Sequence, residues 1–122
     1  MLLEGIKVVE LGQFIFVPYC ATHLIDFGAE VIKIENPAGG DPMRGVRRAT
    51  HLPDVGINYY FDQNNRGKKS LALDVNSKTG QEVVYKLVSR SDIFMTNFQP
   101  ETLKRMHLDY DTLSKLNPRL IY

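Results

Sequence analysis

The chain has 122 residues, of which 43% are hydrophobic and 24% are charged. This size and composition are those of one globular domain or part of one, and they exclude a disordered chain, a collagen and a coiled coil. The net charge of +1 is unevenly spread, because residues 44–69 contain six basic and two acidic side chains. This local excess is too small for a nucleic-acid partner, but it suits a local anionic group such as a ligand phosphate.

Other broad classes are set aside on the same grounds. No stretch approaches the roughly 20 uninterrupted apolar residues of a membrane span, and the first residues lack the basic start and long apolar run of an export signal. We therefore expect a cytoplasmic protein without a membrane partner. The single cysteine excludes an internal disulfide, and His23, His51 and His107 have no nearby thiols, so we expect no metal site.

The first part of the chain predicts a βαβ unit. Residues 6–11 and 29–35 are short β-branched runs, which predict two strands. Between them, Pro18 suits the first turn of a helix and Gly28 suits its C′ position. Cys20 lies beside the apolar stripe of this helix, and we expect it to be buried. A strand, a helix and a strand in close succession favour a right-handed crossover between parallel strands.

Residues 36–65 show no periodicity apart from a short helical turn predicted at residues 58–61, and such a long irregular stretch is typical of a functional loop. Within it, Asp41 follows two glycines, and we interpret it as a turn residue rather than as a site acid. A third strand is predicted at residues 69–74, and it is followed by an amphipathic helix that Ser77 caps.

The last part of the chain continues the alternation. A fourth strand is predicted at residues 93–97, two short helices at 100–106 and 111–116, and the start of a fifth strand at 119–122. The pattern predicts an α/β fold with a Rossmann-like open parallel sheet and flanking helices. Because a parallel sheet normally continues past a strand that has just begun, we interpret residues 1–122 as the N-terminal part of this domain.

The turn after the first strand is the first candidate site, since open α/β sheets bind ligands at the carboxyl ends of their strands. Glu35 lies 23 residues after Gly12, where a ribose-binding acid would fall, but bulky side chains replace the glycine loop that a pyrophosphate needs. A nicotinamide or flavin enzyme is therefore not predicted, and Glu35 is interpreted as a surface or pairing acid. Phe14, Ile15 and Phe16 can wall an apolar slot, although from the sequence we favour core packing.

Two other turns carry groups suited to a phosphate or a base. The turn before the third strand contains Arg66, Lys68 and Lys69, three cations that can hold a phosphate. The other turn is residues 97–100, which offer an amide and an aromatic face. It precedes a short helix that carries Arg105. An ordinary capped turn explains either sequence equally well.

Taken together, these segments resemble the N-terminal part of the class III coenzyme A transferases, the CaiB/BaiF family. This family includes formyl-CoA transferase and carnitine CoA-transferase, with α-methylacyl-CoA racemase as a relative. The matching stretches run the whole length of the chain, and they are residues 3–11, 27–35, 40–44, 65–74 and 117–122.

The resemblance implies a CoA-binding Rossmann-like domain within a longer chain that forms an interlocked homodimer. It implies coenzyme A or acyl-CoA and a carboxylic acid as the small-molecule partners, with no metal. It also implies an aspartate nucleophile beyond Tyr122, which attacks an acyl-CoA thioester to form a mixed anhydride, is converted to an aspartyl-CoA thioester and then passes CoA to the acceptor acid. Residues 1–122 alone are therefore expected not to catalyse CoA transfer.

The resemblance further implies coenzyme contacts in the turns after all four strands and on the helix that follows the fourth. By position these contacts are Ile15, Phe16, Asn36, Leu73, Asp74, Val75, Asn76, Asn97, Phe98, Gln99 and Arg105.

Three departures from the family pattern bear on these contacts. The small Ala-Gly pair often found before Pro18 is Phe16-Val17 here, which puts a bulky ring near the expected thioester. Where some members have an arginine near the adenine, this chain has Asn36. Where Arg-Pro-Gly is common in the family, residues 99–101 are Gln-Pro-Glu.

Two alternatives to a transferase stay open on the sequence. One is a 2-methylacyl-CoA racemase, which needs a histidine and an aspartate as a proton-transfer pair. The other is a non-catalytic CoA-binding or assembly module.

Overall fold

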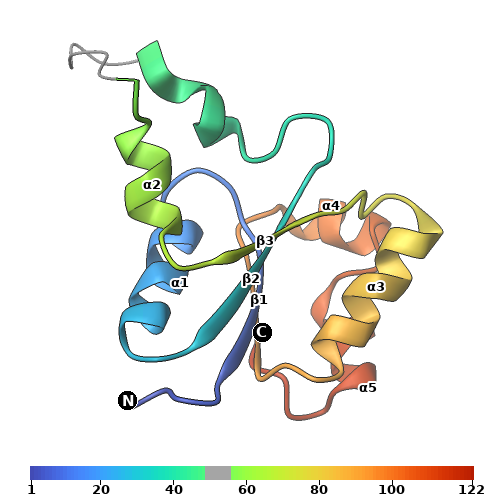
Figure 1. Cartoon of the computed structure of the whole chain (residues 1–122). Coiled ribbons are helices and arrows are strands. Elements are labelled where there is room, and N and C mark those ends of the chain that lie inside the picture. The colour runs from blue at the N-terminus through green and yellow to red at the C-terminus, as the bar shows by residue number, and fades with distance from the viewer. Residues whose placement is uncertain (49–55) are drawn as a thin grey trace.

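The computed structural model describes residues 1–48 and 56–122, without the side chains of Arg47 and Arg48. His51 and Asp54 lie outside the described residues. The described chain forms one parallel sheet in the order β3-β2-β1-β4 with helices on both faces (Figure 1). The strands are β1 (Lys7–Leu11), β2 (Glu30–Glu35), β3 (Lys69–Ala72) and β4 (Ile93–Thr96). This confirms the α/β, Rossmann-like class.

Two layers of helices enclose the sheet (Figure 1). On one face lie α1 (Phe16–Asp26) and α2 (Tyr59–Asn65), which pack on each other. The 3₁₀ helix η1 (Pro42–Arg48) lies between β2 and α2 in the chain and contacts α2. On the other face lie α3 (Lys78–Val88), α4 (Pro100–Arg105) and α5 (Tyr110–Leu116). No helix in the described ranges is long and apolar enough to cross a membrane.

The strand order brings distant turns together. Strand β1 pairs with β2 on one side and with β4 on the other, all in parallel. The direction in which the sheet grows therefore reverses at β1, and the turns after β1 and β4 meet at this switch point. Ligands of open α/β sheets bind in this crevice.

The two faces of the sheet have different cores. Val9 and Leu11 of β1 join a large apolar cluster with α3, α4 and α5. Val8, on the opposite face, joins a smaller cluster that includes Ala21 of α1 and Val31 of β2. The alternation of side chains along a strand explains this division. It also places Glu10 on the face of the smaller cluster, where the sequence offers few apolar residues.

The predicted helix boundaries are confirmed where the capping chemistry is local. Gly28 follows α1 with φ +106°, and the hydroxyl of Ser77 accepts a hydrogen bond from the amide of Gly80 at 3.0 Å. The predicted third strand is two residues too long. Asp74 leaves the sheet because its carboxylate accepts a hydrogen bond from the amide of Asn76, which starts the turn into α3.

Other expectations need correction. Residues 36–65 are less irregular than predicted, since they contain both η1 and α2. The predicted helical turn at residues 58–61 is confirmed and is the start of α2, which Asn58 caps by accepting a hydrogen bond from the amide of Phe61. The fifth strand is a single parallel bridge between Ile93 and Ile121. The predictions that Phe14, Ile15, Phe16 and Cys20 pack in the core are wrong, because all four are exposed. The buried side of α1 is formed by Pro18, Ala21 and Thr22, and Phe16 and Cys20 lie on its other side.

Gly80 fixes the approach of α3 to the turn before it, which gives a first prediction. A Cβ on Gly80 would overlap the carbonyl oxygen of Asp74. We expect Gly80→Ala to lower the free energy of unfolding by about 1–3 kcal/mol through overpacking and to displace residues 74–76. Chemical denaturation measures the first effect, and the amide NMR shifts of residues 74–76 report the second.

Gly39→Ala is the matched control, because a Cβ at Gly39 meets no atom within 4 Å. Equal stability of the two variants would contradict the steric account.

Candidate functional site

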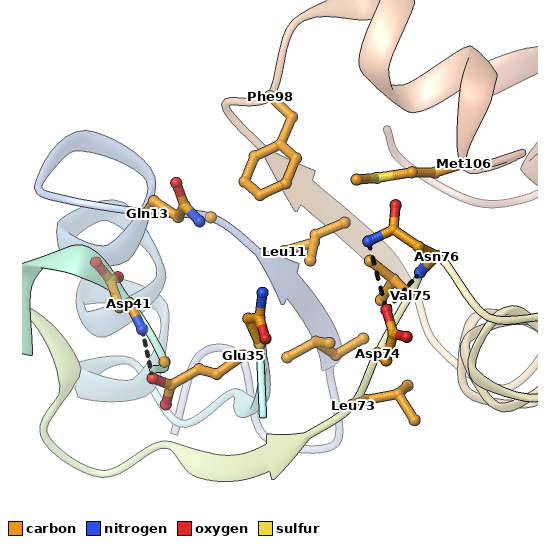
Figure 2. Close-up of a pocket in the computed structure, with 14 residues that line it drawn as sticks. Leu11, Gln13, Glu35, Asp41, Leu73, Asp74, Val75, Asn76, Phe98 and Met106 are labelled. Atoms are coloured by element: carbon orange, nitrogen blue, oxygen red, sulfur yellow. Dashed lines mark hydrogen bonds between the residues drawn. The ribbon is translucent and has the colours of Figure 1, made fainter. Parts of the chain in front are cut away.

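A pocket lies at the carboxyl ends of the strands (Figure 2). We call it the C-edge pocket. Its lining combines apolar side chains with carboxylates and amides. The apolar lining is Leu11, Ile34, Leu73, Val75, Phe98 and Met106; the rest is Gly12, Gln13, Glu35, Asn36, Gly40, Asp41, Asp74 and Asn76.

The C-edge pocket continues into a second hollow. The C-edge pocket has a volume of about 80 Å³. This volume is small beside the roughly 300–1,000 Å³ of pockets that enclose a drug-sized ligand. The second hollow has about 290 Å³ and is lined by Gln13, Phe14, Asn97, Phe98, Gln99 and Thr102. Since Gln13 and Phe98 line both, the two hollows adjoin. An extended ligand therefore fits this edge better than a compact one.

The structure brings most of the expected contact residues to these hollows. Asn36, residues 73–76 and Phe98 line the C-edge pocket, and Asn97 and Gln99 line the second hollow with Phe98. Ile15, Phe16 and Arg105 line neither of the two. Phe16 stands on the surface with 86% of its area exposed, and Arg105 is exposed on α4.

Asn97 has a structural task at the switch point. Its side-chain oxygen accepts a hydrogen bond from the amide of Gln13 at 3.0 Å, and its side-chain nitrogen donates to the carbonyl of Gln13 at 2.8 Å. This side chain therefore ties the turn after β1 to the turn after β4. One amide proton and one lone pair are left for other partners.

The three cations of the turn before β3 form ion pairs with acidic side chains of the same chain. Arg66 pairs with Asp26, Lys69 pairs with Glu30 at 3.0 Å, and Lys68 pairs with Glu10 at 2.6 Å. The side chain of Lys68 is only 2% exposed, so Lys68 cannot reach an outside phosphate without leaving its partner. The three cations thus fix the turn before β3 to α1, β1 and β2.

Glu35 is a pairing acid, as one of the two interpretations held, and it is buried. Its carboxylate accepts two hydrogen bonds from the guanidinium of Arg44, at 2.7 and 2.8 Å, one from Ser70 at 3.0 Å and one from the amide of Asp41 at 3.0 Å. Arg44 also lies over the ring of Phe61, 3.9 Å from its centre. Burial by itself raises the pKa of Glu35, but these hydrogen bonds outweigh it and lower the pKa to about 2.

Four buried charges lie under the edge of the sheet. We call Glu10, Lys33, Asp41 and Lys68 the buried network. The ammonium of Lys33 contacts Glu10 at 2.7 Å and Asp41 at 2.9 Å, and Lys68 contacts the other oxygen of Glu10. Glu10, Lys33 and Asp41 are each no more than 2% exposed. Two cations and two anions balance, which is the condition for burying charge at all.

The remaining polar atoms of the buried network are almost all satisfied. Lys68 donates hydrogen bonds to the carbonyl of Pro18 at 2.8 Å and to Asn65 at 3.1 Å. Burial lowers the pKa of Lys68, and the contact with Glu10 opposes this effect. One oxygen of Glu10 and one of Asp41 lack a hydrogen bond, and each instead lies in ion-pair contact with a lysine.

Sequence reasoning missed the buried network and the Asp41 part of the site. The interpretation of Asp41 as a turn residue is incomplete, since Asp41 lines the C-edge pocket and is ion-paired as well. A signal was present: Glu10 and Lys33 each interrupt an apolar strand, and the register of β1 and β2 makes them direct neighbours. Among the described residues, no three His, Cys, Asp or Glu side chains gather in a way that would hold a metal ion.

The low pKa of Glu35 predicts acid sensitivity. Its folded pKa of about 2 lies below the ordinary value of 4.5, so its stabilising effect is complete above about pH 4.5 and is lost as the pH falls toward 2. Because Arg44 is 44% exposed, we discount the shift for solvent and expect about 2 kcal/mol. Urea unfolding from pH 2.5 to 7 measures it.

Glu35→Gln is the control, since an amide does not titrate. The difference in free energy of unfolding between wild type and this variant should shrink as the pH falls through this window. A pH-independent difference would contradict the role given to Glu35.

Comparison with known proteins adds relatives of known activity. The succinyl-CoA–L-malate CoA-transferase alpha subunit of Chloroflexus aurantiacus is 42% identical over 119 residues, which are 98% of this chain and 27% of the relative. The (R)-2-hydroxy-4-methylpentanoate CoA-transferase of Clostridioides difficile is 45% identical over an alignment of 125 positions, which covers 100% of this chain and 31% of the relative. The chain thus spans about a third or less of the length of these relatives.

Solved structures agree with the fold. A CaiB/BaiF family protein from Brucella suis superposes with a TM-score of 0.87 at 38% identity, over 98% of this chain and 32% of that one. Rv3272 from Mycobacterium tuberculosis gives 0.88 at 35% identity, over 98% of this chain and 32% of its own. The sequence model of CoA-transferase family III matches residues 3–122. The chain therefore belongs to CoA-transferase family III.

Proposed function

We propose that the C-edge pocket and the adjoining hollow bind coenzyme A for an enzyme that moves CoA from an acyl-CoA donor to a carboxylic acid. The observation that carries this proposal is the pair of adjoining hollows at the switch point of the sheet. The relatives named above are CoA-transferases, and this chain matches them over almost its whole length.

The chemistry of the two hollows suits a molecule with a flat base and a long polar arm. In the C-edge pocket, Phe98 and Met106 offer an aromatic ring and a thioether, and Asn36 and Asn76 offer amides. Side chains of these types stack on a base and hydrogen-bond to its edge. The exposed guanidinium of Arg105 supplies a cation for a phosphate.

Further contacts in this proposal come from the turns after β1 and β4. Ile15 and Phe16 stand at the entry to α1 and border the reacting end of the coenzyme in this proposal. Gln99 and Asn97 contribute from the turn after β4. The transfer itself runs through an aspartate outside these 122 residues, so that the chain contributes the coenzyme half of the site. A homodimer of the longer protein completes it.

The substrates suggested by the relatives are small carboxylic acids. We propose that the intact protein accepts CoA from a donor such as succinyl-CoA and passes it to a hydroxy acid. Incubation with a panel of donors and acceptors, read by mass spectrometry of the CoA esters, tests this. Exchange of the α-proton of a 2-methylacyl-CoA without CoA transfer would instead indicate a racemase. Coenzyme binding without either reaction would indicate a non-catalytic CoA-binding or assembly module.

Arg105 provides the sharpest single-residue prediction for this site. Because a phosphate loses a charge-assisted hydrogen bond, Arg105→Ala should weaken CoA binding by the intact protein about tenfold or more, with little effect on folding. Isothermal titration calorimetry measures the affinity.

Arg90→Ala is the matched control, since Arg90 is also exposed but follows α3 and lines a hollow with Lys7, where β1 begins. Equal losses of affinity in the two variants would exclude a specific contact by Arg105.

A further inference from the structure

The turn after β1 is held by side chains from other elements at each of its residues. We call Gly12, Gln13 and Phe14 the clamped turn. The ammonium of Lys33 donates a hydrogen bond to the carbonyl of Gly12 at 2.9 Å. Asn97 bonds both backbone groups of Gln13, as described above. The amide of Phe14 donates to the carboxylate of Asp41 at 3.1 Å.

Phe14 makes these clamps necessary. Its φ is +64°, in the left-handed region that a non-glycine residue enters only at an energetic cost. Phe14 is 49% exposed, so burial does not offset this cost in full. The hydrogen bond from its own amide to Asp41 is therefore a direct means of holding the conformation.

Two of the three clamps are members of the buried network. Lys33 and Asp41 pair with each other at 2.9 Å, and Lys33 also pairs with Glu10. A buried ion pair is tolerated only where its geometry satisfies both charges, because separating the partners leaves a charge unpaired in the interior. Lys33 and Asp41 are therefore held in place by their mutual ion pair. Their hydrogen bonds to Gly12 and Phe14 in turn hold the clamped turn in place.

The clamped turn forms the boundary between the two hollows. Gln13 lines both of them, Gly12 lines the C-edge pocket, and Phe14 lines the second hollow. Asp41 itself lies in the wall of the C-edge pocket (Figure 2). A shift of this turn would therefore change both hollows together.

We infer that Lys33 and Asp41 are positioning residues, which act on the ligand through the clamped turn by holding Phe14 in its left-handed conformation. This inference rests on the proposed function, because the ligand whose binding they promote is coenzyme A. Neither residue needs to touch the coenzyme for this role.

Asp41→Asn in the intact protein is the primary variant. Asp41 accepts hydrogen bonds from the amides of Phe14 and Met43 with one oxygen and lies in ion-pair contact with Lys33 through the other. Asparagine is uncharged and offers one oxygen in place of two, so either the two amides or Lys33 lose the oxygen that they contact. We expect the Kd for CoA to rise about tenfold.

Phe14→Gly distinguishes positioning from general stabilisation. Glycine adopts a φ of +64° without strain, so the turn needs the clamp less. In a double-mutant cycle, Asp41→Asn should then raise the Kd less than about threefold on the Phe14→Gly background. The same rise in Kd on both backgrounds, or no rise on either, would overturn the inference.

Hydrogen exchange of the ligand-free protein gives a readout that does not depend on CoA. Asp41→Asn and Lys33→Met should each speed exchange of the amides of Gln13 and Phe14 about tenfold relative to amides in α3. If either variant does not fold, the other supplies the comparison. A Phe14 amide that exchanges freely in the wild-type protein would also overturn the inference.

Val84→Ala serves as the control for stability. Val84 is a fully buried residue of α3 in the large apolar cluster, and it belongs neither to the clamped turn nor to the buried network, so its truncation destabilises the fold without removing a clamp. It should leave the Kd for CoA unchanged. If the wild-type protein does not bind CoA at all, the proposed function fails, while the exchange experiment still decides the positioning role.

Discussion

The buried network of Glu10, Lys33, Asp41 and Lys68 is the interaction on which the rest of the structure depends. It joins β1 to β2 through Glu10 and Lys33, and it joins the turn before β3 to α1 through Lys68. Removing one partner of such a pair costs about 3–5 kcal/mol, because it leaves a charge buried and unpaired. The network therefore specifies one arrangement of the elements around the sheet edge, where an apolar cluster would allow several.

This arrangement separates two uses of basic side chains. The cations of the turn before β3 are bound by acids of the same chain and maintain the fold. The cations on α4, Lys104 and Arg105, are instead exposed, and in the proposed function Arg105 contacts a phosphate. A cluster of basic residues in a sequence therefore does not by itself locate an anion site, because its partners are decided by the tertiary fold.

Much of the fold could be predicted, because its signals are local. Gly28 and Ser77 end and begin helices through their own backbone and hydroxyl chemistry, and alternation of strands and helices indicates a parallel sheet. The site was predicted less completely. The register that pairs Glu10 with Lys33, and the fold of residues 36–48 that carries Asp41 under the sheet edge, are tertiary. The exposure of Phe16 follows from the angle at which α1 enters, which no local pattern encodes.

We propose that coenzyme A binds along the carboxyl edge of this sheet, across the two hollows that meet at Gln13 and Phe98. A crystal structure of the intact protein with CoA is the most direct test. We expect electron density for the adenine and phosphates beside Phe98 and residues 73–76, with Arg105 within hydrogen-bond distance of a phosphate. Density for the coenzyme at the opposite edge of the sheet, or on the surface of α1 and α2, would contradict it.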